Sequence, residues 1–202
     1  MKTKIILEKY PEELKDVDNI CGIDEAGRGA LSGPIFAASV ILPKDFESEL
    51  IRDSKKLSEK KRLEAFSLIK EEAISWSYAY VDAEDIDKHN IQNANFSAMY
   101  NSLLKLYPQP EHILVDGNVF EDYYEVPHTC VVKGDDKYLP IAAASIVAKV
   151  LRDEYMKNID KTFPEYNWKS NKGYGSKEHI EKILKEGITY HHRKSFLKKI
   201  LN

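Results

Sequence analysis

Residues 21–34 read Cys-Gly-Ile-Asp-Glu-Ala-Gly-Arg-Gly-Ala-Leu-Ser-Gly-Pro, and the rest of the chain is organised around this stretch. Two adjacent carboxylates, Asp24 and Glu25, end an apolar run, and glycines then flank Arg28. Paired carboxylates can hold cations, glycine lets the backbone approach a ligand closely, and a guanidinium matches the geometry of phosphate oxygens. A metal pair beside a phosphate contact suggests phosphodiester chemistry. A tight turn closed by a surface ion pair between Glu25 and Arg28 is the alternative.

The composition is typical of a folded globular protein. Of the 202 residues, 43% are apolar and 31% are charged, which argues against disorder and predicts a single domain with its own core. The apolar run at residues 5–7 is too short for a signal peptide, and runs of about eight residues such as 35–42 cannot span a bilayer. We therefore expect a cytoplasmic protein. A monomer is the default expectation because no exposed apolar stripe is evident, and Cys21 and Cys130 are expected to be buried free thiols.

Charge is distributed unevenly along the chain. The net charge is −3, but residues 169–202 contain nine Lys or Arg against three Glu, a local charge of +6 that leaves −9 for the remainder. This asymmetry suits a basic arm that grips a polyanion beside an acidic site that holds cations. A solvated C-terminal helix is the alternative explanation.

The hydrophobic pattern predicts a mixed sheet flanked by helices. Short apolar runs predict strands at residues 20–23, 34–42, 74–81, 112–116 and 126–132, of which the first three form an antiparallel unit. Helices are expected from Ser58 to Ala73, from Asn90 to Tyr107 and from Pro140 onward. This order of elements indicates one compact α/β unit.

Two of these helices, and a further one near the C-terminus, carry apolar residues that we expect to face inward. They are Leu63, Phe66, Ile69 and Ala73 in the first helix, and Phe96, Met99, Tyr100, Leu103, Leu104 and Tyr107 in the second. A last helix, capped by Ser176 and ended by Gly187, should turn Ile180, Ile183 and Leu184 inward. Its exposed lysines, with Arg193, Lys194, Lys198 and Lys199, would hold the backbone of a polyanion.

Further carboxylates follow the later strands. Asp116 ends an apolar triplet typical of a strand buried on both faces, and open α/β sheets bind ligands at such strand ends. Asp135, Asp136 and Asp153 are all candidates for a fourth ligand. A helix separates Asp135 from Asp153 by roughly 20 to 27 Å, so only one can lie at ions about 4 Å apart. Asp135 follows a strand directly, whereas Asp153 has the helical spacing of a surface ion-pair partner.

Two features of the first motif loops depend on the tertiary structure. Asp24 and Glu25 face opposite sides of a strand, so they share a site only if the chain curls or bulges there. Lys55 and Lys56 can contact phosphate if their loop borders the carboxylates. Otherwise they are solvated charges.

Five motifs, in this order, resemble those of ribonuclease HII and cover about residues 20–196. They are Asp24-Glu25-Ala26-Gly27-Arg28-Gly29, Asp53-Ser54-Lys55-Lys56-Leu57, Val115-Asp116-Gly117, Lys133-Gly134-Asp135 with the following Ala142–Lys149, and Asn171-Lys172-Gly173-Tyr174-Gly175-Ser176. The resemblance implies an RNase H-like fold with a mixed five-stranded sheet. Residues 1–165 would form the catalytic domain, and residues 166–202 a basic helical segment that packs on it and contacts substrate.

The same resemblance implies an activity and a site. The activity is endonucleolytic cleavage of the RNA strand of RNA–DNA hybrids and of the 5′ side of single ribonucleotides in duplex DNA, with two Mg²⁺ or Mn²⁺ ions. Asp24, Glu25, Asp116 and Asp135 would be the catalytic metal ligands. Gly27, Arg28 and Gly29 would read the 2′-hydroxyl and the adjacent phosphate, and Tyr174 would stack at the RNA–DNA junction.

Three alternatives share parts of this pattern. Ribonuclease HIII is similar but carries a long N-terminal extension and usually lacks the arginine found here at position 28. A four-carboxylate 3′-to-5′ exonuclease needs an acidic cluster but not the glycine-arginine turn. A hybrid-binding module without activity needs no intact carboxylate set.

Overall fold

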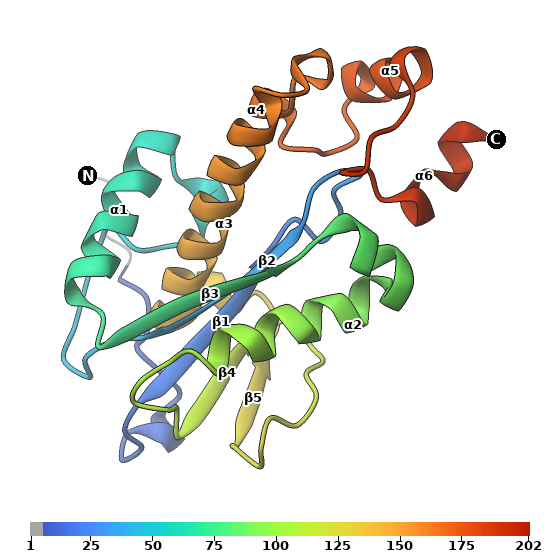
Figure 1. Ribbon diagram of the computed structural model, residues 1–202. Coiled ribbons are helices and arrows are strands. Elements are labelled where there is room, and N and C mark those ends of the chain that lie inside the picture. Colours follow the sequence, from blue (N-terminus) through green and yellow to red (C-terminus); the bar gives the residue numbers. More distant parts are fainter. Residues whose placement is uncertain (1–5) are drawn as a thin grey trace.

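The structure, a computed structural model, describes residues 6–202 and contains one mixed sheet with strand order β3-β2-β1-β4-β5 (Figure 1). β1 pairs antiparallel with β2 and β2 with β3, while β1, β4 and β5 run parallel. The predicted five-stranded mixed sheet is confirmed. The strands are β1 (Ile20–Ala26), β2 (Ile35–Ile41), β3 (Ser75–Val81), β4 (His112–Asp116) and β5 (His128–Val131), the last shorter than expected. Residues 1–5, where the predicted domain begins, lie outside the described residues.

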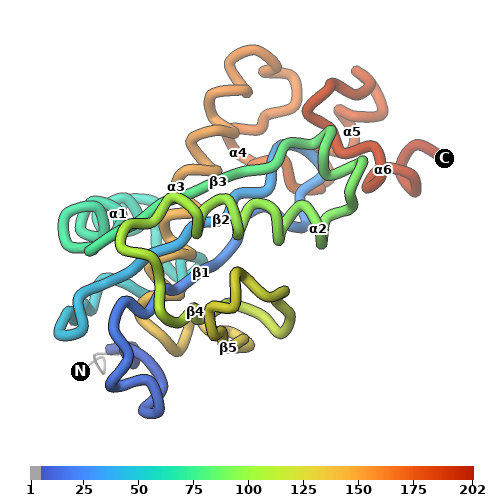
Figure 2. Tube along the Cα trace, turned by 60° about the horizontal axis from the view of Figure 1, so that its bottom comes forward, coloured from blue at the N-terminus to red at the C-terminus, as the bar shows by residue number. Residues whose placement is uncertain are grey.

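Helices cover both faces of the sheet, as the two views in Figures 1 and 2 show. α1 (Glu59–Glu72) and α3 (Leu139–Asp160) pack on one face, and α2 (Ala83–Leu103) packs on the other. Each face has its own apolar core, so the central strands are buried on both sides. Short 3₁₀ turns connect the elements: η1 (Glu12–Leu14), η2 (Ser54–Lys56), η3 (Gly134–Asp136) and η4 (Pro164–Tyr166).

Gly22 lets α3 come close to β1. A Cβ at this position would lie 2.1 Å from the carbonyl carbon of Pro140, at the start of α3. Because no side chain fits there, the beginning of α3 rests directly on the centre of the sheet. The loop that precedes α3, which carries Asp135, is therefore placed beside the end of β1.

The C-terminal segment packs at the far end of α3. It contains α4 (Trp168–Asn171), α5 (Lys177–Glu186) and α6 (Lys194–Leu201), which share a small core with Met156 of α3. Ser176 accepts a hydrogen bond from the amide of His179 and Gly187 ends α5, as predicted. The inward position of Leu184 is wrong, because its side chain is 60% exposed while the neighbouring Ile183 is buried.

The predicted second helix differs at both ends. α2 begins at Ala83, where the carboxylate of Asp82 caps it, and Asn90 lies at a kink with φ of 65°. The amide oxygen of Asn90 accepts hydrogen bonds from the next turn, so Asn90 does cap the longer part of the helix. Its apolar stripe is buried only up to Leu103. The expected core positions of Leu104 and Tyr107 are wrong, because both side chains are exposed. The same holds for Leu63 of α1.

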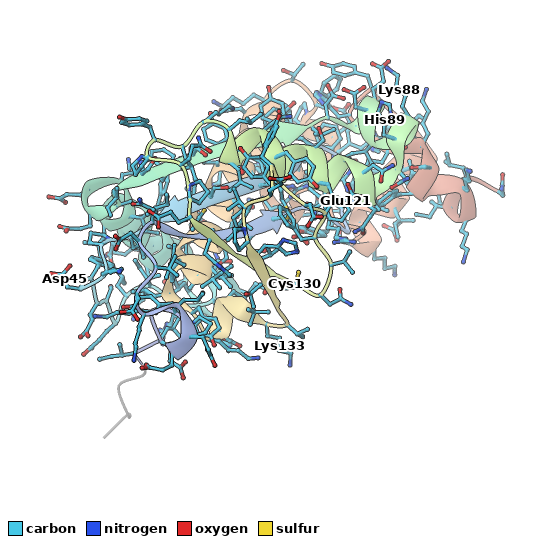
Figure 3. The ribbon with its side chains drawn as sticks, turned by 90° about the horizontal axis from the view of Figure 1, so that it is seen from below. Asp45, Lys88, His89, Glu121, Cys130 and Lys133 are labelled. Carbon is cyan, nitrogen blue, oxygen red and sulfur yellow. The ribbon has the colours of Figure 1, made fainter. Side chains whose placement is uncertain are left out.

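Two further expectations concern the cysteines and the membrane. Both cysteines are free; Cys21 is buried, and Cys130 on β5 is only partly buried (Figure 3). Among the helices of residues 6–202, none combines the length and apolar character required to cross a bilayer.

Candidate active site

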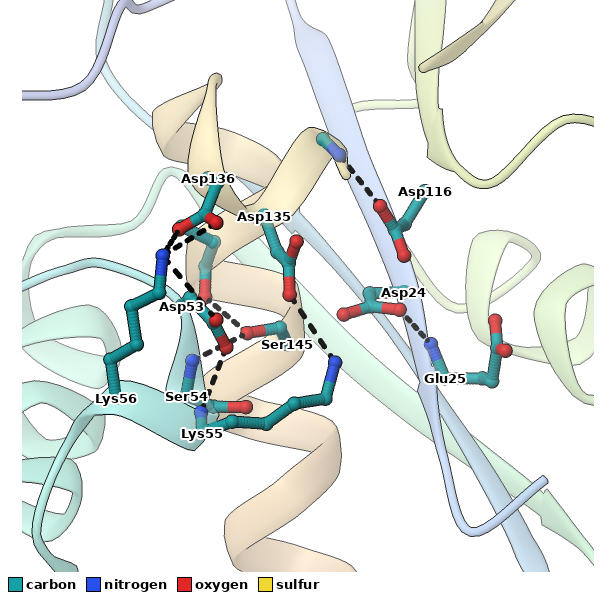
Figure 4. Close-up of polar contacts among 12 residues, drawn as sticks. Asp24, Glu25, Asp53, Ser54, Lys55, Lys56, Asp116, Asp135, Asp136 and Ser145 are labelled. Carbon is teal, nitrogen blue, oxygen red and sulfur yellow. Dashed lines mark hydrogen bonds and ion pairs between the residues drawn. The ribbon is translucent and has the colours of Figure 1, made fainter. Parts of the chain in front are cut away.

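Three carboxylates from distant parts of the chain lie near one another at one edge of the sheet. Ile23 of β1 pairs with Val115 of β4 in parallel register, so Asp24 and Asp116 follow side by side on strands that lie about 4.8 Å apart. Asp116 accepts a hydrogen bond of 2.7 Å from the amide of Gly134, which brings the η3 turn and its Asp135 to the same edge. Figure 4 shows Asp24, Asp116 and Asp135 directed toward one another.

Glu25 reaches the site from the other side of β1. The strand ladder continues regularly through Ala26, so the curl that would place Glu25 on the face of Asp24 is not found. Glu25 is nevertheless mostly buried, and it lines the same cavity of about 490 Å³ as Asp24. The guanidinium of Arg28 lies 3.7 Å from its carboxylate. The ion pair of the alternative reading is therefore present, but inside the candidate site.

Burial and mutual repulsion change the acidity of this group. The pKa of Asp24 is raised well above its ordinary value, first by burial and then by the negative charges of Glu25 and Asp116. Burial also raises the pKa of Glu25, against the effect of Arg28, and that of Asp135, where Asp116 adds to it. Carboxylates held together at such a cost are a functional-site signal.

The loop that carries Lys55 and Lys56 borders the carboxylates. The amide of Ser54 is held by the Ser145 hydroxyl of α3, which fixes the η2 turn against the site. The ammonium of Lys55 lies 3.5 Å from Asp135, whereas Lys56 pairs with Asp136 outside the group (Figure 4). Lys55 is thus within the predicted site and Lys56 is at its margin.

Asp136 and Asp153 lie outside the carboxylate group. Asp136 is held by Lys56, and Asp153 accepts a hydrogen bond of 2.7 Å from Lys149. The helical ion pair predicted for Asp153 is confirmed, although both of its side chains are partly buried.

Two buried arginines shape the glycine-rich turn. Arg152 of α3 donates hydrogen bonds to the carbonyls of Ser32, Pro34 and Lys172, and Arg193 donates to those of Arg28 and Gly33. Both guanidiniums are almost inaccessible to solvent. Burial, and then the charge of Arg152, lower the pKa of Arg193 to about 9. The expectation that Arg193 lies on the surface and grips a polyanion is therefore wrong.

Tyr174 lies on the wall of the same cavity. Its side chain is 39% exposed, and the guanidinium of Arg152 lies 5.3 Å from the centre of its ring. The carbonyl of Gly173 accepts hydrogen bonds from the amides of Leu31 and Ser32, which ties this segment to the glycine-rich turn. Gly27, Arg28, Gly29 and Tyr174 therefore line one cavity.

Several residues at the site escaped the sequence analysis. Arg152 and Asn95 lie in helices whose patterns indicated only packing, and Ser145 stands in the Ala142–Lys149 stretch without a predicted role of its own. The amide of Asn95 contacts Glu25, and its side-chain oxygen is buried without a partner among the described residues. Buried polar residues in an apolar helical stripe were the only available signal.

The donor set suits hard divalent cations. All four predicted ligands offer carboxylate oxygens, which Mg²⁺ and Mn²⁺ prefer. The carboxylates repel one another, and a bound cation would offset this repulsion. Within residues 6–202, no three acidic, histidine or cysteine side chains are already gathered closely enough to hold a metal ion. The residues therefore fit divalent cations by chemistry, while their side chains stand further apart than in a closed ligand set.

Comparison with known proteins identifies the family. A family model described as Ribonuclease HII matches residues 21–199. Ribonuclease HII of Parabacteroides distasonis is 54% identical over 175 residues, covering 87% of this chain and 88% of that protein. Ribonuclease HII of Porphyromonas gingivalis is 48% identical over 193 residues, covering 95% and 94%.

Solved structures agree with this result. Ribonuclease H2 of Pyrococcus horikoshii is similar with a TM-score of 0.75 at 25% identity, covering 90% of this chain and 96% of that one. RNase HII of Archaeoglobus fulgidus, solved in complex with PCNA, has a TM-score of 0.72 at 27% identity, with coverage of 87% and 93%.

A ribonuclease HIII, the Bst enzyme in complex with Mn²⁺, shares the fold at 17% identity and a TM-score of 0.71. The match covers 95% of this chain but 73% of that longer one. The predicted RNase H-like fold is confirmed, and the chain belongs to the ribonuclease HII family of ribonuclease H enzymes.

Proposed function

We propose that this protein is an endonuclease that hydrolyses the RNA strand of RNA–DNA hybrids and nicks duplex DNA on the 5′ side of a single ribonucleotide. The observation that carries the proposal is the meeting of Asp24, Asp116 and Asp135 beside a cavity lined by the glycine-rich turn and Tyr174. The carboxylates supply ligands for cations, and the glycine-rich turn on the cavity wall supplies a surface for the sugar-phosphate backbone.

The carboxylates would hold the catalytic ions. Asp24, Glu25, Asp116 and Asp135 would bind two Mg²⁺ or Mn²⁺ ions, which when bound activate a water and stabilise the leaving 3′-oxygen. The products would carry a 3′-hydroxyl and a 5′-phosphate. Arg28, which is exposed at the cavity, would contact the phosphate beside the cleaved bond, and the ammonium of Lys55, which lines the same cavity, would add positive charge.

Recognition of RNA requires a contact with the 2′-hydroxyl, since this group alone distinguishes the two sugars. Gly29 is exposed and has no other atom within 4 Å of where its Cβ would be, so a sugar edge can approach its backbone directly. The ring of Tyr174 would pack on the deoxyribose that follows the ribonucleotide, where an added hydroxyl would alter the fit.

The basic C-terminal segment would hold the duplex. Arg193 is excluded from this role by its burial, but six lysines of the segment are exposed: Lys169, Lys177, Lys185, Lys194, Lys198 and Lys199. Binding should therefore weaken as salt is added. Action as a monomer stays a prediction.

One assay separates the proposal from its alternatives. A DNA duplex with a single internal ribonucleotide is incubated with Mg²⁺ or Mn²⁺, and the ends are mapped beside an all-DNA control. One internal nick with a 3′-hydroxyl supports the proposal, a ladder from one end supports an exonuclease, and retention without cutting supports a binding module. In the same assay, Asp116→Asn should bind the duplex and leave it uncut.

A further inference from the structure

The backbone that carries Tyr174 is held by a buried histidine of α5. His179 has no exposed surface, and its Nδ1 lies 2.9 Å from the carbonyl oxygen of Tyr174. Its Nε2 lies 3.0 Å from the indole nitrogen of Trp168. The imidazole therefore bridges the core of the C-terminal segment and the wall of the cavity.

The chemistry of Trp168 determines the protonation of this imidazole. An indole N–H can only donate, so Nε2 of His179 must accept and the ring proton must reside on Nδ1. Nδ1 is then a donor that points at the carbonyl of Tyr174. Burial lowers the pKa of His179, which favours this neutral form.

Hydrogen bonds fix the backbone on both sides of Tyr174, so the orientation of Tyr174 itself depends on the bonds that its carbonyl accepts. On one side, Gly173 is bonded to the glycine-rich turn through Leu31 and Ser32. On the other side, the Tyr174 carbonyl also accepts a bond of 2.8 Å from the amide of Ser176. The orientation of the peptide after Tyr174 consequently depends on two donors, the amide of Ser176 and Nδ1 of His179. Among the described residues, His179 is the only one whose side chain hydrogen-bonds this carbonyl.

We propose that His179 is a positioning residue for substrate recognition: its Nδ1–H, oriented by Trp168, holds the Tyr174 backbone so that the ring faces the cavity. This inference rests on the proposed function of Tyr174 at the junction between ribonucleotide and deoxyribose. Loss of the bond should impair cleavage at a single embedded ribonucleotide more than cleavage of a continuous hybrid, because only the former has a deoxyribose at that place.

Two variants separate the bond from the fold. In His179→Asn, the amide nitrogen stands at the distance from Cβ that Nδ1 has in histidine, so the donor to Tyr174 is kept and Trp168 loses its acceptor. In His179→Gln, the longer amide reaches the place of Nε2, so Trp168 keeps an acceptor and Tyr174 loses its donor. His179→Asn leaves the buried indole N–H of Trp168 unpaired, so it should be the less stable variant. It should nevertheless keep more of the preference for a single embedded ribonucleotide, because the donor to Tyr174 is retained.

The readout is the ratio of kcat/KM for the single-ribonucleotide duplex to kcat/KM for a continuous RNA–DNA hybrid. We expect His179→Gln to lower this ratio about tenfold, the effect of one lost buried hydrogen bond, and His179→Asn to stay within about threefold of the wild type. Ile183→Val, which loosens the packing of α5 without touching the bond, should leave the ratio unchanged. In a Tyr174→Ala background, His179→Gln should have no further effect, since it acts through the ring.

A second measurement does not depend on activity. Long-range ¹H–¹⁵N NMR of the imidazole should show a protonated Nδ1 and an unprotonated Nε2 for His179. The opposite tautomer, equal ratios for the two His179 variants, or a persisting effect in the Tyr174→Ala background would overturn the inference. Failure of the wild type to nick the single-ribonucleotide duplex would instead overturn the proposed function, and the NMR result would still decide how the Tyr174 carbonyl is held.

Discussion

Replacing Gly27 and Gly29 by alanine should separate stability from recognition within one motif. Gly27 has a φ of 94°, and a Cβ there would lie 1.9 Å from Nε of Arg152. Gly29 has open space around the position of its Cβ. The same chemical change is therefore made twice, two residues apart, against opposite surroundings.

The cost at Gly27 has two parts. An alanine in the left-handed region costs about 1–2 kcal/mol. Arg152 cannot move aside freely, because its guanidinium is bonded to three carbonyls at 3.0, 3.0 and 3.2 Å. Breaking one of these charged hydrogen bonds adds about 1.5–3 kcal/mol. We expect Gly27→Ala to lower the free energy of unfolding by about 2.5–5 kcal/mol, and Gly29→Ala to change it by less than about 0.5 kcal/mol.

Urea unfolding of the metal-free proteins measures this difference through the shift in midpoint at constant slope. The cleavage assay should then show that Gly29→Ala loses activity at a single ribonucleotide while remaining folded, because its methyl group projects into the cavity. If Gly27→Ala is as stable as the wild type, or Gly29→Ala as unstable as Gly27→Ala, the described packing of the turn on Arg152 is wrong.

Three further predictions concern charge. The raised pKa of Asp24 means that the folded state keeps a proton that the unfolded state releases, so the metal-free protein should lose stability as pH rises above about 4 and through the raised pKa. Urea midpoints measured at pH 5 and pH 8 in the presence of a chelator test this. If Asp24→Asn loses as much stability between these two pH values as the wild type, the prediction is contradicted. Lys55→Gln removes the ammonium that competes with a cation for Asp135, so it should tighten Mn²⁺ binding in calorimetry by roughly two- to fivefold, the range of an exposed ion pair. Lys56→Gln is the matched control, and an equal effect of both variants would refute the assignment of Asp135 as a metal ligand. Replacing Lys198 and Lys199 by Gln should flatten the salt dependence of duplex binding by up to about two phosphate contacts in fluorescence anisotropy; an unchanged slope would remove α6 from the binding surface.

Local signals accounted for most of the fold. The apolar triplet before Asp116 predicted a strand buried on both faces, and Ile113, Leu114 and Val115 are inaccessible to solvent. Ser58 and Ser176 cap helices as expected, since a hydroxyl just before an amphipathic run carries its own structural meaning. These features depend on neighbours in the sequence.

The residues that the sequence misplaced or left without a role depend on partners that are distant in the chain. Arg193 contacts the carbonyl of Arg28, 165 residues earlier, so nothing near it distinguishes it from the lysines that follow. His179 lies in a helix that buries only one other residue, Ile183, and its role follows only from its contacts with Trp168 and Tyr174. Helical spacing predicts Leu184 in the core, but α5 buries only His179 and Ile183 and leaves Leu184 exposed. Motif resemblance could name the carboxylates; only the register of β1 and β4 brings two of them side by side.

The central claim is that carboxylates from three separate segments jointly hold the catalytic cations. Crystals of the protein soaked with Mn²⁺ and measured at the manganese absorption edge test it directly. We expect two anomalous peaks about 4 Å apart, with oxygens of Asp24, Asp116 and Asp135 within about 2.5 Å of one or both. Peaks that lie away from these side chains, or a site held by Asp136 or Asp153 instead of Asp135, would contradict the account.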